Sequence, residues 1–176
     1  KMGEIYFAKS TIYLKQSKIK KAEISLLSGI KILPKNFKAI FQLGNIYLME
    51  KNYEKAIEEF DKAIKIKKDF WQAINNQGLA YFELNKINLS IISFKKAIEL
   101  EENAEPLLAL ASCLKNKDIN KAIVLAKKAL NKDPNYVDFN YRKEQLWGEK
   151  LQISTEKLFE NPQIKKEILV AKTKIK

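Results

Sequence analysis

FQLGNIYLMEKNYEKAIEEFDKAIKI, residues 41–66, is the stretch that decides the fold. Its apolar residues recur three and four positions apart on both sides of a short polar turn, which is typical of two amphipathic helices. Gly44 lies in the middle of the first pattern, although a glycine inside a helix costs about 1 kcal/mol relative to alanine. A sequence tolerates this cost where another part of the chain must come close to the backbone. We therefore predict that the two helices cross closely at Gly44.

The same pattern returns after 34 residues. Four pairs of residues repeat at this period: Gly44 and Gly78, Tyr47 and Tyr81, Phe60 and Phe94, Ala63 and Ala97. Imperfect copies precede and follow these two repeats. The last copy aligns when one residue is removed from its turn and one from the preceding connection. We therefore predict helix–turn–helix repeats at about residues 3–36, 37–70, 71–103 and 104–136, so that the repeat array covers residues 3–136.

This pattern resembles the tetratricopeptide repeat. The small–aromatic–alanine–aromatic–alanine signature of that family is carried by Gly44, Tyr47, Ala56, Phe60 and Ala63. Lys68 replaces the usual closing proline, and Lys9 and Gln77 stand where the family usually has leucine. The resemblance implies an all-α fold, a right-handed superhelical solenoid of four helix pairs whose first helices line a concave groove.

Residues 137–176 depart from the repeat, and we predict that they form capping helices over the open end of the last repeat. One further helix is expected in YVDFNYRKEQLWGEKL, residues 136–151, and a short one near residues 154–159. Asn161 and Pro162 predict the N-cap and first residue of a terminal helix. An alternative for this last helix is a mobile basic amphipathic tail that touches membranes or partners.

Residue composition argues against an enzyme. The 176 residues include no histidine and a single cysteine, Cys113, and the few glycines are isolated. The chain therefore has no His-based metal site or catalytic triad, no CxxC motif and no phosphate-binding glycine loop. We predict a non-enzymatic protein with no cofactor, no metal and no small-molecule substrate, in which Cys113 is a small core residue.

A second stripe on the first helices carries carboxamides flanked by apolar groups. An amide side chain both donates and accepts hydrogen bonds, so it can hold an extended peptide backbone. The candidate groove residues are Lys38, Phe41, Gln42, Asn45, Gln72, Asn75, Asn76 and Leu79. In the family that the chain resembles, chaperone-binding members clamp a terminal carboxylate with cations, but Phe41, Glu105 and Ala109 stand at those places here. The alternative is that these amides are only solvated surface.

The net charge of +12 comes from many lysines. The candidate basic surface consists of Lys67, Lys68, Lys95, Lys96, Lys127 and Lys128. Base readout and bidentate phosphate contacts usually use arginine, and the chain has only Arg142, which disfavours nucleic acid as a partner. An anionic membrane surface or an acidic protein is a better match for such charge, unless the lysines reflect a compositional bias without function.

We interpret the chain as a protein–protein interaction scaffold or adaptor that holds a segment of a protein or peptide partner. One alternative is a peripheral membrane assembly factor, because residues 70–84 and 143–151 are similar to tetratricopeptide proteins of cyanobacteria and plastids, whose relatives help assemble membrane complexes. Non-specific nucleic-acid binding is a second alternative. We expect a cytoplasmic location with membrane association as an alternative, and an anchor or signal could precede Lys1.

Overall fold

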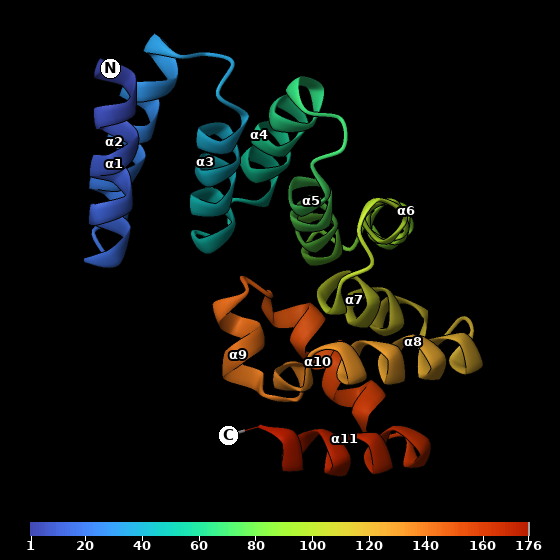
Figure 1. The fold of residues 1–176 in the computed structure, drawn as a ribbon. Helices are drawn as coiled ribbons and strands as arrows, with labels where there is room; N and C mark the ends of the chain where they lie inside the picture. Colours follow the sequence, from blue (N-terminus) through green and yellow to red (C-terminus); the bar gives the residue numbers. More distant parts are fainter. Residues whose placement is uncertain (176) are drawn as a thin grey trace. The chain divides into compact units, whose positions relative to one another are not determined.

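The computed structural model describes residues 1–175, and this part of the chain consists of helices and connections without a β-strand (Figure 1). The prediction of an all-α fold is therefore confirmed. The helices are α1 (Met2–Lys15), α2 (Ile19–Ile32), α3 (Phe37–Met49), α4 (Tyr53–Ile66), α5 (Trp71–Glu83), α6 (Ile87–Leu100), α7 (Ala104–Leu114), α8 (Ile119–Lys132), the 3₁₀ helix η1 (Pro134–Val137), α9 (Phe139–Glu144), α10 (Glu149–Phe159) and α11 (Pro162–Lys174).

The chain divides into two compact units, unit 1 (Lys1–Ala73) and unit 2 (Ile74–Lys176). In unit 1, α1 packs on α2, α2 on α3, and α3 on α4. In unit 2, α6 packs on α7 and α7 on α8, and the last helices pack on these. The division falls inside α5, so the two units are described separately.

The turns inside the first three helix pairs share one backbone geometry. Ser17, Lys51 and Asn85 have positive φ angles of 57°, 59° and 60°. In each turn the next amide donates back to a tyrosine carbonyl: Lys18 N to Tyr13 O at 2.8 Å, Asn52 N to Tyr47 O at 2.8 Å, and Lys86 N to Tyr81 O at 2.9 Å. A left-handed residue with such a bond is the usual way to end a helix sharply. The period of 34 residues thus repeats the backbone conformation as well as the side chains.

Gly44 provides the close approach that the sequence predicts. A Cβ atom at Gly44 would lie 2.5 Å from Cε1 of Phe60, and one at Gly78 would lie 2.7 Å from Cε1 of Phe94. Both phenylalanine rings are completely buried. The ring of the second helix therefore rests on the bare backbone of the first helix in each pair.

The predicted single helix over residues 136–151 is wrong. Its place is taken by η1, α9 and the start of α10, with a break between Gln145 and Gly148. Leu146 has a φ of 66°, and Gly148 is the extended N-cap residue of α10. A Cβ atom at Gly148 would overlap the carboxyl group of Glu83, so any other residue there would force that side chain to move. A contact with a residue far away in the sequence thus interrupts the helical pattern.

The last two helices cover the final repeat pair: α10 packs on α7, and α11 packs on α8 and η1. The predicted start of α11 is confirmed, since the side chain of Asn161 accepts a hydrogen bond from Gln163 N at 2.9 Å and Pro162 is the first helical residue. Ile164 and Ala171 of α11 are buried. The helix is therefore a packed element along this face.

Arg142, the one arginine of the chain, is completely buried beneath these helices. Its Nε donates to Gln152 Oε1 at 2.8 Å, one terminal nitrogen donates to Tyr136 O at 2.7 Å, and the other pairs with Glu156. These contacts all serve the internal structure of the C-terminal segment. Arg142 therefore has no free face for a phosphate group.

We predict that Gly44→Leu lowers the free energy of unfolding by about 3 kcal/mol, because the new side chain must displace the ring of Phe60 from a packed crossing. Urea unfolding followed by far-UV circular dichroism measures this loss. Ala8→Leu, at an exposed position of α1, is the matched control and should change stability by less than about 0.5 kcal/mol. Equal midpoints for Gly44→Leu and wild type would remove the close-crossing argument.

Candidate functional site

The candidate groove residues of unit 1 lie on α3 and at the start of α5. Lys38 is exposed at the start of α3, whereas Gln42, Asn45 and Gln72 are half-buried. Lys38, Gln42 and Asn45 share one face of α3, because they are spaced four and three residues apart. An ammonium group and two amides are thus presented together on this helix.

Phe41 of the same set belongs to an aromatic cluster inside unit 1. Its ring centroid lies 5.8 Å from that of Phe60 and 4.9 Å from that of Phe70. Phe37 makes an edge contact with Phe70 at 5.0 Å. Such contacts fix the ring of Phe41, which lies on the same face of α3 as Lys38 and Asn45, three and four residues away.

The candidate groove residues of unit 2 are buried. Asn75 and Leu79 have no exposed surface, and Asn76 is 8% exposed. Asn75 Nδ2 donates to Asn76 Oδ1 at 3.1 Å, and the Asn75 side chain also hydrogen-bonds the carboxyl group of Glu105 on α7. These amides are therefore engaged inside unit 2, and they do not face solvent.

Glu105 links the buried amides to the C-terminal segment. Trp147 Nε1 donates to Glu105 Oε1 at 3.1 Å, and the Trp147 ring lies against Tyr136 with centroids 6.0 Å apart. Burial raises the pKa of Glu105 to about 7, although the hydrogen bonds from Trp147 and Asn75 act in the opposite direction. Glu105 occupies one of the positions where a carboxylate clamp has a cation, and here Trp147 of the same chain holds its carboxyl group inside the protein.

Glu83 at the end of α5 holds the start of α10. Its carboxylate accepts hydrogen bonds from Lys150 N at 3.2 Å and from Leu151 N at 3.0 Å, and Lys150 Nζ donates to the Glu83 carbonyl at 2.6 Å. A carboxylate at a helix N-terminus satisfies the free amides and complements the helix dipole. The sequence analysis missed Glu83, because no residue near it in the sequence signals this contact.

A third set of polar contacts lies farther along α10. Ser154 Oγ donates to the Ser112 carbonyl at 2.9 Å, and the hydroxyls of Ser112 and Thr155 lie 2.7 Å apart. Together with the contacts of Glu83 and Glu105, these bonds attach the C-terminal segment to the faces of α5 and α7. In unit 2 the chain itself therefore covers faces that the repeat pattern assigns to a groove.

Several lysines of the candidate basic surface have partners. The ammonium of Lys67 lies 5.3 Å from the centroid of the Phe37 ring, Lys96 pairs with Glu99 at 3.5 Å, and Lys127 pairs with Glu167 at 3.5 Å. Lys128 pairs with Glu102. Lys68 and Lys95 are exposed. With Arg142 buried, neither nucleic-acid binding nor membrane binding gains support from these contacts, and both stay predictions.

Residues 1–175 present neither a candidate metal site nor a reactive thiol. This part of the chain contains no group of three or more acidic, cysteine or histidine residues that could hold a metal ion. Cys113 is buried, and burial raises the pKa of its thiol to about 12, so the thiol stays protonated at neutral pH. Among these described residues, none of the helices is both long and apolar enough to span a membrane.

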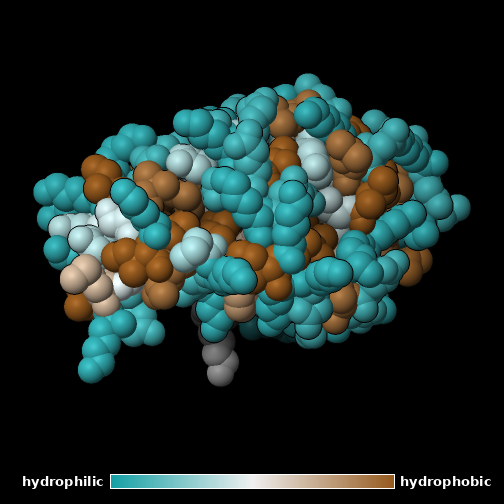
Figure 2. Space-filling view, turned by 90° about the horizontal axis from the view of Figure 1, so that it is seen from above, coloured by the Kyte–Doolittle hydropathy of each residue, from teal (hydrophilic) through white to brown (hydrophobic). Residues whose placement is uncertain are grey.

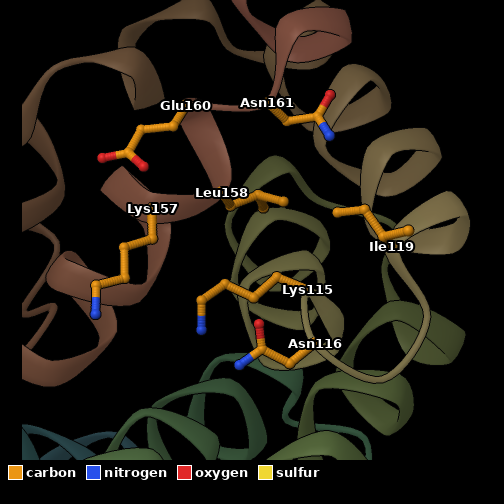
Figure 3. Close-up of a pocket in the computed structure, with 7 residues that line it drawn as sticks. All are labelled: Lys115, Asn116, Ile119, Lys157, Leu158, Glu160 and Asn161. Atoms are coloured by element: carbon orange, nitrogen blue, oxygen red, sulfur yellow. The ribbon is translucent and has the colours of Figure 1, made fainter.

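An open cavity of about 600 Å³ lies where α7 and α10 end (Figure 3). It is lined by Lys115, Asn116, Ile119, Lys157, Leu158, Glu160 and Asn161. Lys115 and Lys157 stand near the C-terminal ends of their helices, where a cation complements the free carbonyl groups. The lining holds neither paired carboxylates nor a nucleophile, so its chemistry is that of a solvated surface between helix ends.

We predict that Glu105→Gln removes a pH dependence of stability. The raised pKa of Glu105 means that the folded state keeps this proton at a pH where the unfolded chain, with an ordinary value of 4.5, has lost it. The free energy of unfolding should therefore fall by about 1–3 kcal/mol as pH rises from about 4.5 to about 7, and the Glu105→Gln variant should lack that fall. Urea titrations across this range measure it, with Glu149→Gln as the exposed control. An unchanged pH profile in Glu105→Gln would show that Glu105 does not titrate in this range.

Two family models of the tetratricopeptide repeat match the chain, one at residues 37–70 and one at residues 72–103. No curated protein sequence matches it. Among solved structures, a crystal structure of MamA protein is similar with a TM-score of 0.73 and 21% identity, over 98% of this chain and 93% of that one.

TTC0263, a thermophilic tetratricopeptide protein of Thermus thermophilus, has a TM-score of 0.66 and 19% identity, over 82% of this chain and 80% of that one. The first tetratricopeptide domain of Spaghetti (RPAP3), bound to the HSP90 peptide SRMEEVD, has a TM-score of 0.62 and 22% identity, over 65% of this chain and 94% of that one. None of these proteins is named as a photosynthetic assembly factor, so that resemblance stays a prediction. Residues 37–70 and 72–103 are thus tetratricopeptide repeats, and the chain shares the fold of solved tetratricopeptide-repeat structures.

Proposed function

We propose that this chain is a non-enzymatic scaffold that binds an extended segment of a protein partner, and that the polar face of α3 takes part in binding. The observation that carries the proposal is the grouping of Lys38, Gln42 and Asn45 on one helix face of unit 1. The fold supports the general role, because stacked helix pairs create an extended concave surface, and the Spaghetti (RPAP3) domain of the same fold binds a peptide.

The chemistry of this face suits a peptide backbone. An extended segment offers an N–H donor and a C=O acceptor at each residue, and the side chains of Gln42 and Asn45 can each supply both complements. The contacts of Phe41 with the rings of Phe60 and Phe70 restrict the movement of α3, which reduces the entropy lost on binding. The corresponding amides of unit 2, Asn75 and Asn76, are buried, whereas Gln42 and Asn45 are partly exposed, so the proposal places partner contacts on unit 1.

We propose a partner different from the peptide SRMEEVD, with which the Spaghetti (RPAP3) domain was crystallised. The family places a cationic clamp at positions that Phe41, Glu105 and Ala109 occupy here. Phe41 packs against two rings, Glu105 is bonded to Trp147, and Ala109 is buried. Without cations at these places, a terminal carboxylate would lose its water without gaining an ion pair.

The double variant Gln42→Ala/Asn45→Ala tests the proposed face. A library of short random peptides is selected against the wild-type protein, and the enriched peptides are titrated by fluorescence anisotropy. Loss of two backbone hydrogen bonds of about 1 kcal/mol each should weaken binding by roughly tenfold or more. Far-UV circular dichroism should be unchanged, because both side chains are partly exposed and neither belongs to the buried core.

Asn120→Ala is the control, since this amide is exposed on the second helix α8 of a different pair. It should leave affinity unchanged. Asn76→Ala is unsuitable as a test, because it would remove the acceptor of the buried Asn75 amide and perturb the fold. Wild-type affinity of every enriched peptide for the Gln42→Ala/Asn45→Ala variant would exclude the face of α3 as the binding surface.

A further inference from the structure

An apolar hollow lies on the other side of unit 1, between the second helices α2 and α4. Its volume is about 390 Å³, and its lining comes from α2, the turn after it, α3 and α4. The lining residues are Leu27, Ile30, Pro34, Ile40, Leu43, Glu59, Lys62, Lys65 and Ile66. A neighbouring hollow of about 420 Å³ is formed by Leu33, Pro34, Lys35 and Asn36, so Pro34 borders both.

The walls of this hollow are hydrophobic side chains that reach water. Leu27 is 46% exposed and Ile66 is 41% exposed, while Ile40 and Leu43 form a buried floor. Leu33, which lines the neighbouring hollow, is 37% exposed. Brown hydrophobic side chains reach the surface on the face shown in Figure 2, including its left part, where the N-terminal helices lie. A contiguous exposed apolar surface with a recess is typical of an interaction site.

Unit 2 provides an internal comparison, because α6 and α8 have the same lengths as α2 and α4. The positions of Leu27, Pro34 and Ile66 correspond there to Lys95, Glu102 and Lys132. Glu102 pairs with Lys128 and with Lys132 at 3.1 Å, so ion pairs join the turn after α6 to α8. In unit 1 the same three positions are apolar, although nothing in the repeat itself requires it.

The charges around the hollow have one dominant sign. Lys35, Lys62 and Lys65 border the two recesses, and the one carboxylate among the lining residues, Glu59, already pairs with Lys62 at 2.6 Å. A second copy of the chain would bring a net charge of +12 toward these lysines, which opposes self-association through this face. A segment with acidic groups would instead be attracted.

We propose that the hollow between α2 and α4 is a second interaction site, which binds a segment of another protein that carries apolar anchors flanked by Asp or Glu. Leucine-sized side chains enter the recess over Ile40 and Leu43, and the flanking carboxylates meet Lys35 and Lys65. The site lies apart from the polar face of α3, so a partner can occupy it independently.

The test uses two peptide libraries of matched apolar content, displayed on phage and selected against the wild-type protein. In one library the remaining positions are Asp and Glu, and in the other they are Lys and Arg. Selection should enrich binders from the acidic library only. Enrichment from both libraries, or from the basic one alone, would overturn the proposed charge preference and with it the proposal.

A variant that imports the residues of unit 2, Leu27→Lys/Pro34→Glu/Ile66→Lys, then locates the site. It should weaken the enriched acidic peptides by about tenfold or more, because two apolar anchors lose their contacts. The single variants Leu27→Lys and Leu89→Lys form a matched pair, since these leucines are 46% and 43% exposed but Leu89 lies on α6 outside the hollow. Only Leu27→Lys should reduce affinity, and Gln42→Ala/Asn45→Ala should have no effect.

Three further outcomes would overturn the proposal. Acidic peptides could bind the three-residue variant as tightly as wild type, or Leu89→Lys could weaken them as much as Leu27→Lys. In the third outcome, neither library yields a binder, whereas vesicles of phosphatidylcholine and phosphatidylserine bind the wild-type protein and bind the three-residue variant more weakly. That result would assign the face to lipid. Circular dichroism of all variants shows whether each is folded, and the single exposed substitutions keep the test valid if the triple variant does not fold.

Discussion

The contact between a bare helix backbone and an aromatic ring sets the close crossing of the first three helix pairs. The rings of Phe60 and Phe94 lie where a Cβ of Gly44 or Gly78 would stand, and both are completely buried. The first pair reaches the same closeness with the roles exchanged. There Gly29 of the second helix faces Phe7 of the first, and a Cβ atom at Gly29 would overlap that ring. The close crossing is therefore kept while the residues that make it change.

A consequence of this constraint is that function must be built on the remaining helix faces. In unit 2 the face of α5 that carries Asn75 and Glu83, and the face of α7 that carries Glu105, are used to hold the C-terminal segment. Burying carboxyl groups is costly unless donors reach them, and here the donors are Trp147 and the free amides of α10. The chain thus converts polar residues of a groove-like face into the attachment of its own cap.

Periodic and local features of this protein were predictable from sequence, and long-range polar contacts were not. The 34-residue period identified the helix pairs, and the Asn-Pro dipeptide at residues 161–162 identified the start of α11. Asn75 is buried where it bonds to Glu105, and the helical break at Leu146 lies beside the contact with Glu83. Glu83 lies 67 residues before Lys150, to which it bonds. Local helical periodicity carries no information on contacts with distant residues. The sequence of residues 136–151 therefore predicted one continuous helix.

The repeats also show where sequence change is free to create binding surfaces. Exchanges between apolar and charged residues at exposed helix positions cost little stability, whereas exchanges at Gly44 or Phe60 would disturb packing. The outer faces of the two units differ at such exposed positions. Glu102 of unit 2 forms ion pairs, whereas the corresponding region of unit 1 carries the apolar residues Pro34 and Ile66. Ion pairs at an exposed surface contribute little to stability, so their absence in unit 1 needs no compensation. Partner binding can therefore be selected at these positions independently of the fold.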